Sequence, residues 1–156
     1  MSQPLRDDAA DLLLEYAELI DEDRLEEWIE LFTEDASYRV LPRENFDLGL
    51  SVSLILCTNR AMIRDRVVAL RSANEYNLHY DRHLISNIRV KADGGTQAAI
   101  TAHYALMQTT LGGETRLFSV GRYSAAARAE GGRLRLSDML VVVDTFSVPT
   151  LLAAPL

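Results

Sequence analysis

Residues 96–136 of the chain read TQAAITAHYALMQTTLGGETRLFSVGRYSAAARAEGGRLRL. In the first part of this stretch side chains alternate between two faces, so that Tyr104 and His103 lie on opposite faces, and both faces carry apolar groups. A period of two residues is that of a β-strand. The glycine pairs at 112–113 and 131–132 are typical of turns. The stretch therefore predicts three consecutive antiparallel strands joined by tight turns.

The strand pattern also extends towards both ends of this stretch. With a further turn signal at Asp93-Gly94-Gly95, the second half of the chain divides into four strand-like runs, at about residues 82–91, 96–111, 114–128 and 133–145. Each run is longer than the usual five or six residues, and strands of this length must twist and coil. We expect a strongly bent, mainly antiparallel sheet.

The beginning of the chain has helical periodicity instead. Apolar residues between Ala10 and Ile20 recur at intervals of three and four, which predicts a first helix that ends near Ile20. Asp23 followed by Glu26 resembles a capping box and predicts a second, short helix. The apolar stripe of this second helix consists of Leu25, Trp28, Ile29 and Phe32.

The segment between the second helix and the long strands is more varied. Residues 36–41 and 52–56 predict two short strands, with a charged loop at 42–49 between them. Thr58 or Asn59 can cap a third helix after the second of these strands. The core-facing stripe of the third helix is expected to be Met62, Ile63, Val67 and Leu70.

Three helices followed by a long meander predict an α+β fold in which helices cover one face of the sheet. Such a bent sheet and its helices form a cone with an internal cavity. We expect a single domain over residues 1–156. Its neutral, apolar tail at 146–156 is expected to pack on the fold or to contact another subunit, since exposed apolar patches usually mark interfaces.

The composition excludes several classes of function. The net charge is −7 and the basic residues are scattered, which argues against binding to nucleic acid. Cys57 is the only cysteine, so neither an internal disulfide nor a multi-cysteine metal cluster can form. No apolar stretch is long enough to span a bilayer, and the N-terminus lacks an apolar signal segment. We therefore expect a cytoplasmic protein without a membrane partner.

Four segments resemble one known family: Asp21–Phe32, Leu54-Ile55 with Asn59-Arg60, Asp65-Arg66-Val67, and Arg82–Asn87. Their order and spacing are similar to those of the small (beta) subunits of aromatic-ring-hydroxylating dioxygenases, which have the NTF2-like (cystatin-like) cone fold. Other segments resemble the branch that acts on aromatic carboxylates of the terephthalate, salicylate or anthranilate type, with terephthalate-like acids preferred. They are Asn45-Phe46-Asp47 with Gly49-Leu50, Asp65-Arg66 with Ala69-Leu70-Arg71, Gly113-Glu114-Thr115, Gly132–Leu136 and the ending Leu152–Leu156.

This resemblance implies a subunit without catalytic, cofactor-binding or metal-binding residues of its own. Its partner would be the large (alpha) oxygenase subunit, in an α3β3 hexamer that the small subunit assembles and stabilises. The large subunit would hold the iron–sulfur centre and the mononuclear iron of the Rieske-type enzyme, and a separate NAD(P)H-dependent reductase would supply electrons.

Two alternatives remain open at the level of the sequence. His83, Asp21, Tyr38, His103 and Tyr16 could converge in the cavity as in a cofactor-independent dehydratase or isomerase of the scytalone dehydratase type, with His83 as the general base. A ligand-binding module without enzymatic activity is the other alternative.

A metal site at His79 and His83 is rejected. Their spacing suits one face of a helix, but the chain is predicted to be a strand from Arg82 onward, and in an extended chain four residues span about 13 Å. Two imidazoles at that separation do not share one metal ion. A turn before Arg82 would shorten this distance but would not place a carboxylate beside the two imidazoles.

Overall fold

The computed structural model describes residues 3–73, 78–92, 95–145 and 155–156 of the chain. The helices are α1 (Gln3–Asp21), α2 (Leu25–Ile29), α3 (Arg43–Asp47) and α4 (Arg60–Ala73). The strands are β1 (Phe32–Pro42), β2 (Ile55–Cys57), β3 (His79–Ala92), β4 (Gln97–Thr110), β5 (Thr115–Glu130) and β6 (Arg133–Val143). No helix in this part of the chain is long and apolar enough to cross a membrane.

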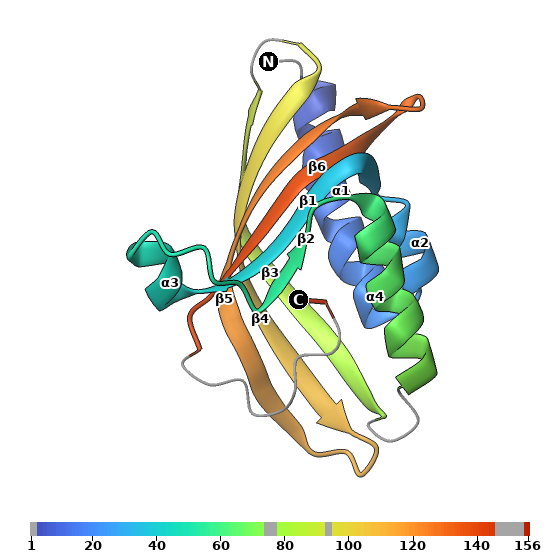
Figure 1. The fold of residues 1–156 in the computed structure, drawn as a ribbon, viewed down its shortest axis with the longest axis vertical. Helices are drawn as coiled ribbons and strands as arrows, with labels where there is room; N and C mark the ends of the chain where they lie inside the picture. The colour runs from blue at the N-terminus through green and yellow to red at the C-terminus, as the bar shows by residue number, and fades with distance from the viewer. Residues whose placement is uncertain (1–2, 74–77, 93–94, 146–154) are drawn as a thin grey trace.

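The six strands form one sheet in the order β2-β1-β6-β5-β4-β3. Neighbouring strands run antiparallel, except for the parallel pair β1 and β6. Shifts of register interrupt four of these pairings, and such irregularities bend and twist a sheet. Figure 1 shows α1, α2 and α4 on one side of the curved sheet, while α3 projects on the other side. The predicted α+β cone is therefore confirmed.

Aromatic side chains fill the space between the helices and the concave face of the sheet. Their rings meet at centroid distances of 4.7–6.4 Å, mostly edge to face, which is the range of favourable aromatic packing. The six rings come from three strands and two helices, and all are at least 98% buried: Tyr16, Trp28, Phe32, Tyr38, Tyr104 and Tyr123.

The four long strands and the first helix are confirmed, while the segments between them differ from the sequence predictions. The second helix ends at Ile29, because Phe32 already begins β1 and reaches the core as part of the sheet. The predicted loop at 42–49 contains the short helix α3, and the strand predicted at 52–56 is β2 at Ile55–Cys57.

The third predicted helix is α4, and the side chain of Asn59 caps it as expected. Its Oδ1 atom accepts a hydrogen bond from the backbone N–H of Met62 at 2.9 Å. Ile63, Val67 and Leu70 are buried, but Met62 is 38% exposed and does not belong to the core stripe.

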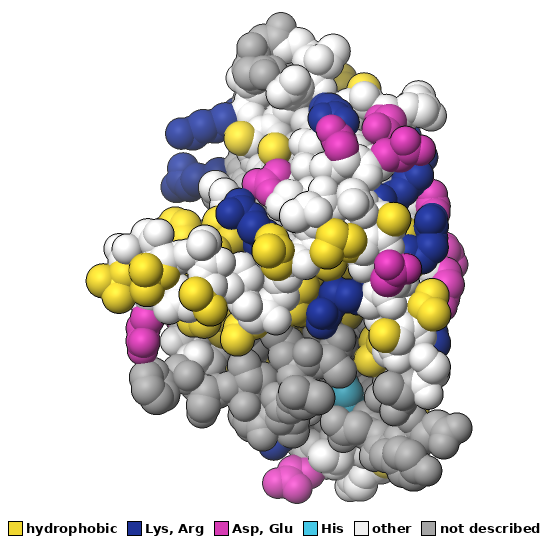
Figure 2. Space-filling view, viewed as in Figure 1, with side chains coloured by type: hydrophobic (Ala, Val, Ile, Leu, Met, Phe, Trp, Pro, Cys, Tyr) yellow, Lys and Arg dark blue, Asp and Glu magenta, His cyan; other side chains and the backbone are white. Residues whose placement is uncertain are grey.

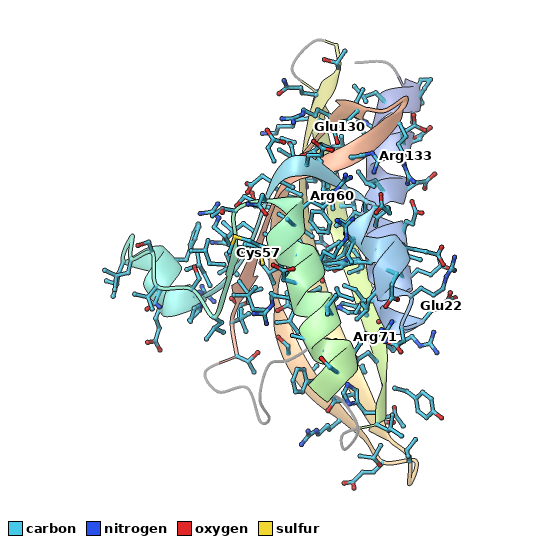
Figure 3. All side chains as sticks on the ribbon, turned by 45° about the vertical axis from the view of Figure 1, so that its right-hand side comes forward. Glu22, Cys57, Arg60, Arg71, Glu130 and Arg133 are labelled. Atoms are coloured by element: carbon cyan, nitrogen blue, oxygen red, sulfur yellow. The ribbon has the colours of Figure 1, made fainter. Side chains whose placement is uncertain are left out.

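The predicted capping box at Asp23 and Glu26 is wrong, because Arg71 on α4 binds both carboxylates. Its guanidinium lies 2.7 Å from Asp23 Oδ1 and 2.8 Å from Glu26 Oε1, and it holds the pKa of Glu26 at about 2. Asp23 has a positive φ of 58°, which turns the chain between α1 and α2. Arg71, labelled in Figure 3, thus joins α4 to this turn.

The C-terminal tail lies mostly outside the described residues. Within residues 146–156, only Pro155 and Leu156 are described, and both are buried. The expectation that the tail packs on the fold is therefore met for these last two residues.

Gly121 on β5 lies close to the backbone of β6 and to the ring of Tyr104 on β4. A Cβ atom added there would lie 2.0 Å from the carbonyl oxygen of Val142 and 2.9 Å from Cε1 of Tyr104. Only glycine lets the ring of Tyr104 lie against β5 at this point.

We predict that Gly121→Ala lowers the free energy of unfolding by about 3 kcal/mol, because backbone atoms of β6 must move to admit the methyl group. Urea unfolding followed by the fluorescence of Trp28, the only tryptophan, measures this change. Gly95→Ala is the matched control, since its Cβ would meet no atom within 4 Å, and it should change stability by less than about 0.5 kcal/mol. Equal stability of the two variants would contradict the packing described here.

Candidate functional site

The interior of the cone contains one buried pair of ionisable side chains. Asp21 ends α1 and His83 lies on β3, and the Nδ1 atom of His83 is 2.5 Å from Oδ1 of Asp21. The backbone N–H of His83 also donates to Oδ2 of the same carboxylate at 2.8 Å. The His83 side chain is fully buried and that of Asp21 is 9% exposed. Two hydrogen bonds thus hold the end of α1 against the edge strand of the sheet.

This geometry orients the imidazole of His83. In the tautomer in which Nδ1–H donates to the Asp21 carboxylate, Nε2 is the ring nitrogen that can accept a proton. Nε2 is buried and has no hydrogen-bond partner among the described residues. A carboxylate that fixes the tautomer of a histidine is the arrangement of a general base, so the pair is chemically competent for proton abstraction.

Four tyrosines share the interior with this pair. Burial raises the pKa of Tyr38 to about 12 and raises the pKa values of Tyr16, Tyr104 and Tyr123 as well. All four phenols are therefore neutral near pH 7 and act as hydrogen-bonding groups. Tyr104 uses its hydroxyl to pair with Ser119 at 2.9 Å.

A line of aromatic rings runs from His83, at one end of the interior, to Tyr16, near the other end. His83 and Tyr104 have ring centroids 6.5 Å apart, Tyr104 stacks on Tyr123 at 4.7 Å, and Tyr123 meets Tyr16 at 5.7 Å. At the far end Tyr16 and Tyr38 both hydrogen-bond to the backbone of Leu156. The interior is filled along this whole line by side chains and by the end of the chain.

Four of the five residues proposed for a catalytic cavity lie in the interior, as two separate pairs. Asp21 and His83 are in direct contact, and Tyr16 and Tyr38 are joined through Leu156. His103 is the exception, because it points to the opposite face of the sheet.

The hypothesis placed His103 in the cavity, which is wrong. Side chains alternate between the two faces of a strand, and His103 is on the outer face. Its neighbour Tyr104 faces the core, so His103 must face outward. There it lines a hollow of about 640 Å³ on the outer side of the sheet, together with Arg89, Arg122 and Phe46. The guanidinium carbon of Arg122 lies 4.8 Å from the centre of the Phe46 ring.

The sequence hypothesis also omitted residues that the structure places inside. Tyr104 and Tyr123 belong to the same aromatic line, and the alternation of β4 and β5 is the signal that identifies them as inward-facing. No periodic signal in the sequence identifies Leu156.

No group of three or more His, Cys, Asp or Glu side chains that could hold a metal ion occurs among the described residues. Strand β3 begins at His79, ahead of the predicted start at Arg82, so extended chain separates His79 from His83. His79 Nε2 instead lies 3.3 Å from Oδ1 of Asp81. One cysteine cannot supply an iron–sulfur centre that needs two, and burial raises the pKa of Cys57 above its usual value.

The chain resembles known proteins over most of its length. Residues 3–139 match the SnoaL-like domain family. The chain is 42% identical over 137 residues to the anthranilate 1,2-dioxygenase small subunit of Burkholderia cepacia, which covers 88% of this chain and 85% of that one. It is 34% identical over 141 residues to subunit beta 2 of the terminal oxygenase component of terephthalate 1,2-dioxygenase from a Comamonas species, covering 90% and 92%.

A solved structure agrees with these relatives. The crystal structure described as the beta subunit of an aromatic-ring-hydroxylating dioxygenase from Novosphingobium aromaticivorans superimposes with a TM-score of 0.88 and 38% identity, over 99% of this chain and 98% of that one. The chain belongs to the family of small subunits of aromatic-ring-hydroxylating dioxygenases. The resemblance of the sequence segments to this family of small subunits is therefore confirmed.

The contact between Asp21 and His83 is predicted to contribute strongly to the stability of the isolated small subunit. His83→Leu should lower the free energy of unfolding by about 3 kcal/mol, because it leaves a buried carboxylate with one partner fewer. His83→Asn should lose much less, since its amide nitrogen can take the place of Nδ1.

Urea unfolding of the purified variants measures both values. His103→Asn is the control, because this exposed site should change stability by less than about 0.5 kcal/mol. A His83→Leu variant as stable as the parent protein would show that the pair is not a structural contact.

Proposed function

We propose that this small subunit assembles and stabilises the large oxygenase subunit of a Rieske-type dioxygenase, in an α3β3 hexamer in the cytoplasm, and that it is inactive by itself. In this proposal the large subunit holds the iron–sulfur centre, the mononuclear iron and the substrate. A separate NAD(P)H-dependent reductase delivers the electrons. The chain forms one domain over residues 1–156 that contributes no cofactor or metal ligand.

The observation that carries this proposal is the 42% identity to the anthranilate 1,2-dioxygenase small subunit over 88% of the chain. Similarity at this level extends over the whole cone and is not confined to one motif. The aromatic part of the interior supports the same conclusion, because its rings pack against one another and Leu156 binds Tyr16 and Tyr38 there.

An aromatic carboxylate is the proposed substrate of the complete enzyme. The relatives named above belong to dioxygenases of anthranilate and of terephthalate, and both acids carry a carboxylate on a benzene ring. The identity to the anthranilate relative is higher than to the terephthalate relative, although the sequence segments favoured a terephthalate-like acid. The class of aromatic carboxylates, to which both acids belong, is therefore a stronger proposal than either acid alone.

The exposed surface around α3 also supports the proposal that this protein is a subunit of a larger complex. Figure 2 shows apolar side chains gathered over α3 and the segment beside it. Six apolar side chains between α3 and β2 are at least 40% exposed, and an exposed apolar patch of this kind marks a contact with another protein. They are Phe46, Leu48, Leu50, Val52, Leu54 and Leu56.

A catalytic role for the cone is the second candidate function, and the orientation of His83 by Asp21 is the observation that favours it. A substrate would have to reach Nε2 of His83, which is buried beside the ring of Tyr104. The assembly role needs no such rearrangement of the interior.

Co-expression with the large oxygenase subunit of the same organism tests the assembly role. Purification through a tag on the small subunit should yield a brown complex with equal amounts of the two chains and a native mass of three copies of each. The large subunit expressed without its partner is the control, and it should be recovered at less than about a tenth of the yield of the complex. A colourless, partner-free dimer of the small subunit would contradict the proposal.

A further inference from the structure

The hollow of about 640 Å³ on the outer face of the sheet has the size of a small-molecule site. Such sites have volumes of about 300–1,000 Å³. Part of its lining is apolar, because it includes the buried side chains of Leu140 and Val142 on β6. The ring of Phe46 on α3, the helix that projects on this side of the sheet in Figure 1, also lines the hollow. The hollow can therefore contact the apolar part of a ligand.

The charge in this hollow is positive. Arg89 on β3 and Arg122 on β5 line it, and neither forms an ion pair within the described part of the chain. No carboxylate of a described residue lines it. Asp138 and Asp144, which precede and follow the apolar residues of β6 in the sequence, lie 3.8 and 3.7 Å from other arginines. Two uncompensated guanidinium groups thus remain in one hollow of a chain whose net charge is −7.

An irregularity in β3 turns Arg89 towards the hollow. In a regular strand every second side chain faces the same side, so Arg89 would share the inner face with His83, six residues earlier. The pairing with β4 instead shifts between Ser86 and Arg89, where Asn87 has a positive φ of 56°. As a result Val90 is buried and Arg89 is exposed. Irregularities that re-aim a side chain in this way are over-represented beside functional sites.

The neighbouring strands place further donors beside Arg122. His103 lies directly opposite Arg122 in the pairing of β4 with β5, and Thr101 lies opposite Ser124. The imidazole and both hydroxyl-bearing side chains belong to residues that line the hollow. The guanidinium carbon of Arg122 lies 4.8 Å from the centre of the Phe46 ring, a cation–π contact that orients the guanidinium beside an aromatic surface. Positive charge, polar donors and an aromatic ring thus meet in one place.

We propose that this hollow is a binding site for a small organic acid in which a carboxylate is attached to a flat apolar ring. Arg89 and Arg122 bind the carboxylate, because a planar guanidinium matches the two oxygens of a carboxylate. The ring of the ligand packs on Leu140 and Val142, beside Phe46. The inference does not rest on the assembly role. Because Phe46 also belongs to the exposed apolar surface around α3, binding is tested on the small subunit by itself.

Titration of the isolated small subunit with benzoate, followed by calorimetry and by the backbone amide signals in NMR spectra, tests the site. Benzoate should bind once per chain with a Kd below about 1 mM at low ionic strength. Benzamide has the same ring without the charge, and acetate has the charge without the ring. Each should bind at least about tenfold more weakly. Raising the NaCl concentration from about 20 mM to about 500 mM should weaken benzoate binding several-fold.

Variants locate the site. Arg89→Gln and Arg122→Gln should each raise the Kd for benzoate about tenfold or more, because each removes a charge-assisted hydrogen bond. Arg82→Gln is the matched control, since Arg82 is an exposed arginine of the same strand as Arg89 but lines a different hollow. It should leave the Kd within about twofold. All three side chains are exposed, so the unfolding temperature should stay within about 2 °C of that of the parent protein.

Three results would each overturn the proposal. One is the absence of saturable binding of benzoate at concentrations up to about 10 mM. The second is equal affinity for benzoate and benzamide, which would show that the carboxylate is not recognised. The third is an equal loss of affinity in Arg82→Gln and Arg122→Gln, which would place the bound benzoate elsewhere. None of these results bears on the yield or composition of the complex with the large subunit.

Discussion

The concave face of the bent sheet has to be filled to the density of a protein interior, because every void there forfeits dispersion contacts. Six aromatic rings from α1, α2, β1, β4 and β5 meet this requirement, and Leu156 completes it. The close approach of Tyr104 to Gly121 and the contact of Asp21 with His83 both follow from how closely the helices and strands surround this space.

Periodicity predicted the parts of the fold that repeat. The long alternating runs gave β3 to β6 their bounds within a few residues, and the alternation already contained the information that His103 faces outward. Elements fixed by distant contacts were not predictable in the same way. Phe32 follows the helical spacing of Trp28 but begins β1, because pairing with β6 takes precedence over local pattern.

Contacts between side chains that lie far apart in the sequence could not be predicted from local patterns either. Arg71 lies 45 residues from Glu26 in the sequence, so its binding of that carboxylate could not be predicted from the local capping pattern. Leu156 reaches Tyr16 across 140 residues, and only its apolar composition indicated that it would be buried. The pair Asp21 and His83 was proposed from its chemistry, and its contact depends on how α1 packs on β3.

Fold and family together explain how one architecture serves different roles. The cone provides a buried histidine oriented by a carboxylate, which is sufficient for a general base. In this small subunit the ring of Tyr104 lies near His83, Leu156 binds Tyr16 and Tyr38 at the other end of the interior, and the exposed apolar surface lies elsewhere, around α3. We therefore propose that the pair supports the fold and that the apolar surface supports assembly.

The most direct test of this account is the turnover of the assembled dioxygenase with His83→Asn in the small subunit, expressed per iron site. This variant keeps a donor to Asp21 and removes Nε2. The account predicts turnover within about twofold of the parent enzyme, with full assembly and iron content. A loss of about 100-fold or more in a complex with full assembly and iron, which is the scale of general acid–base catalysis, would contradict it.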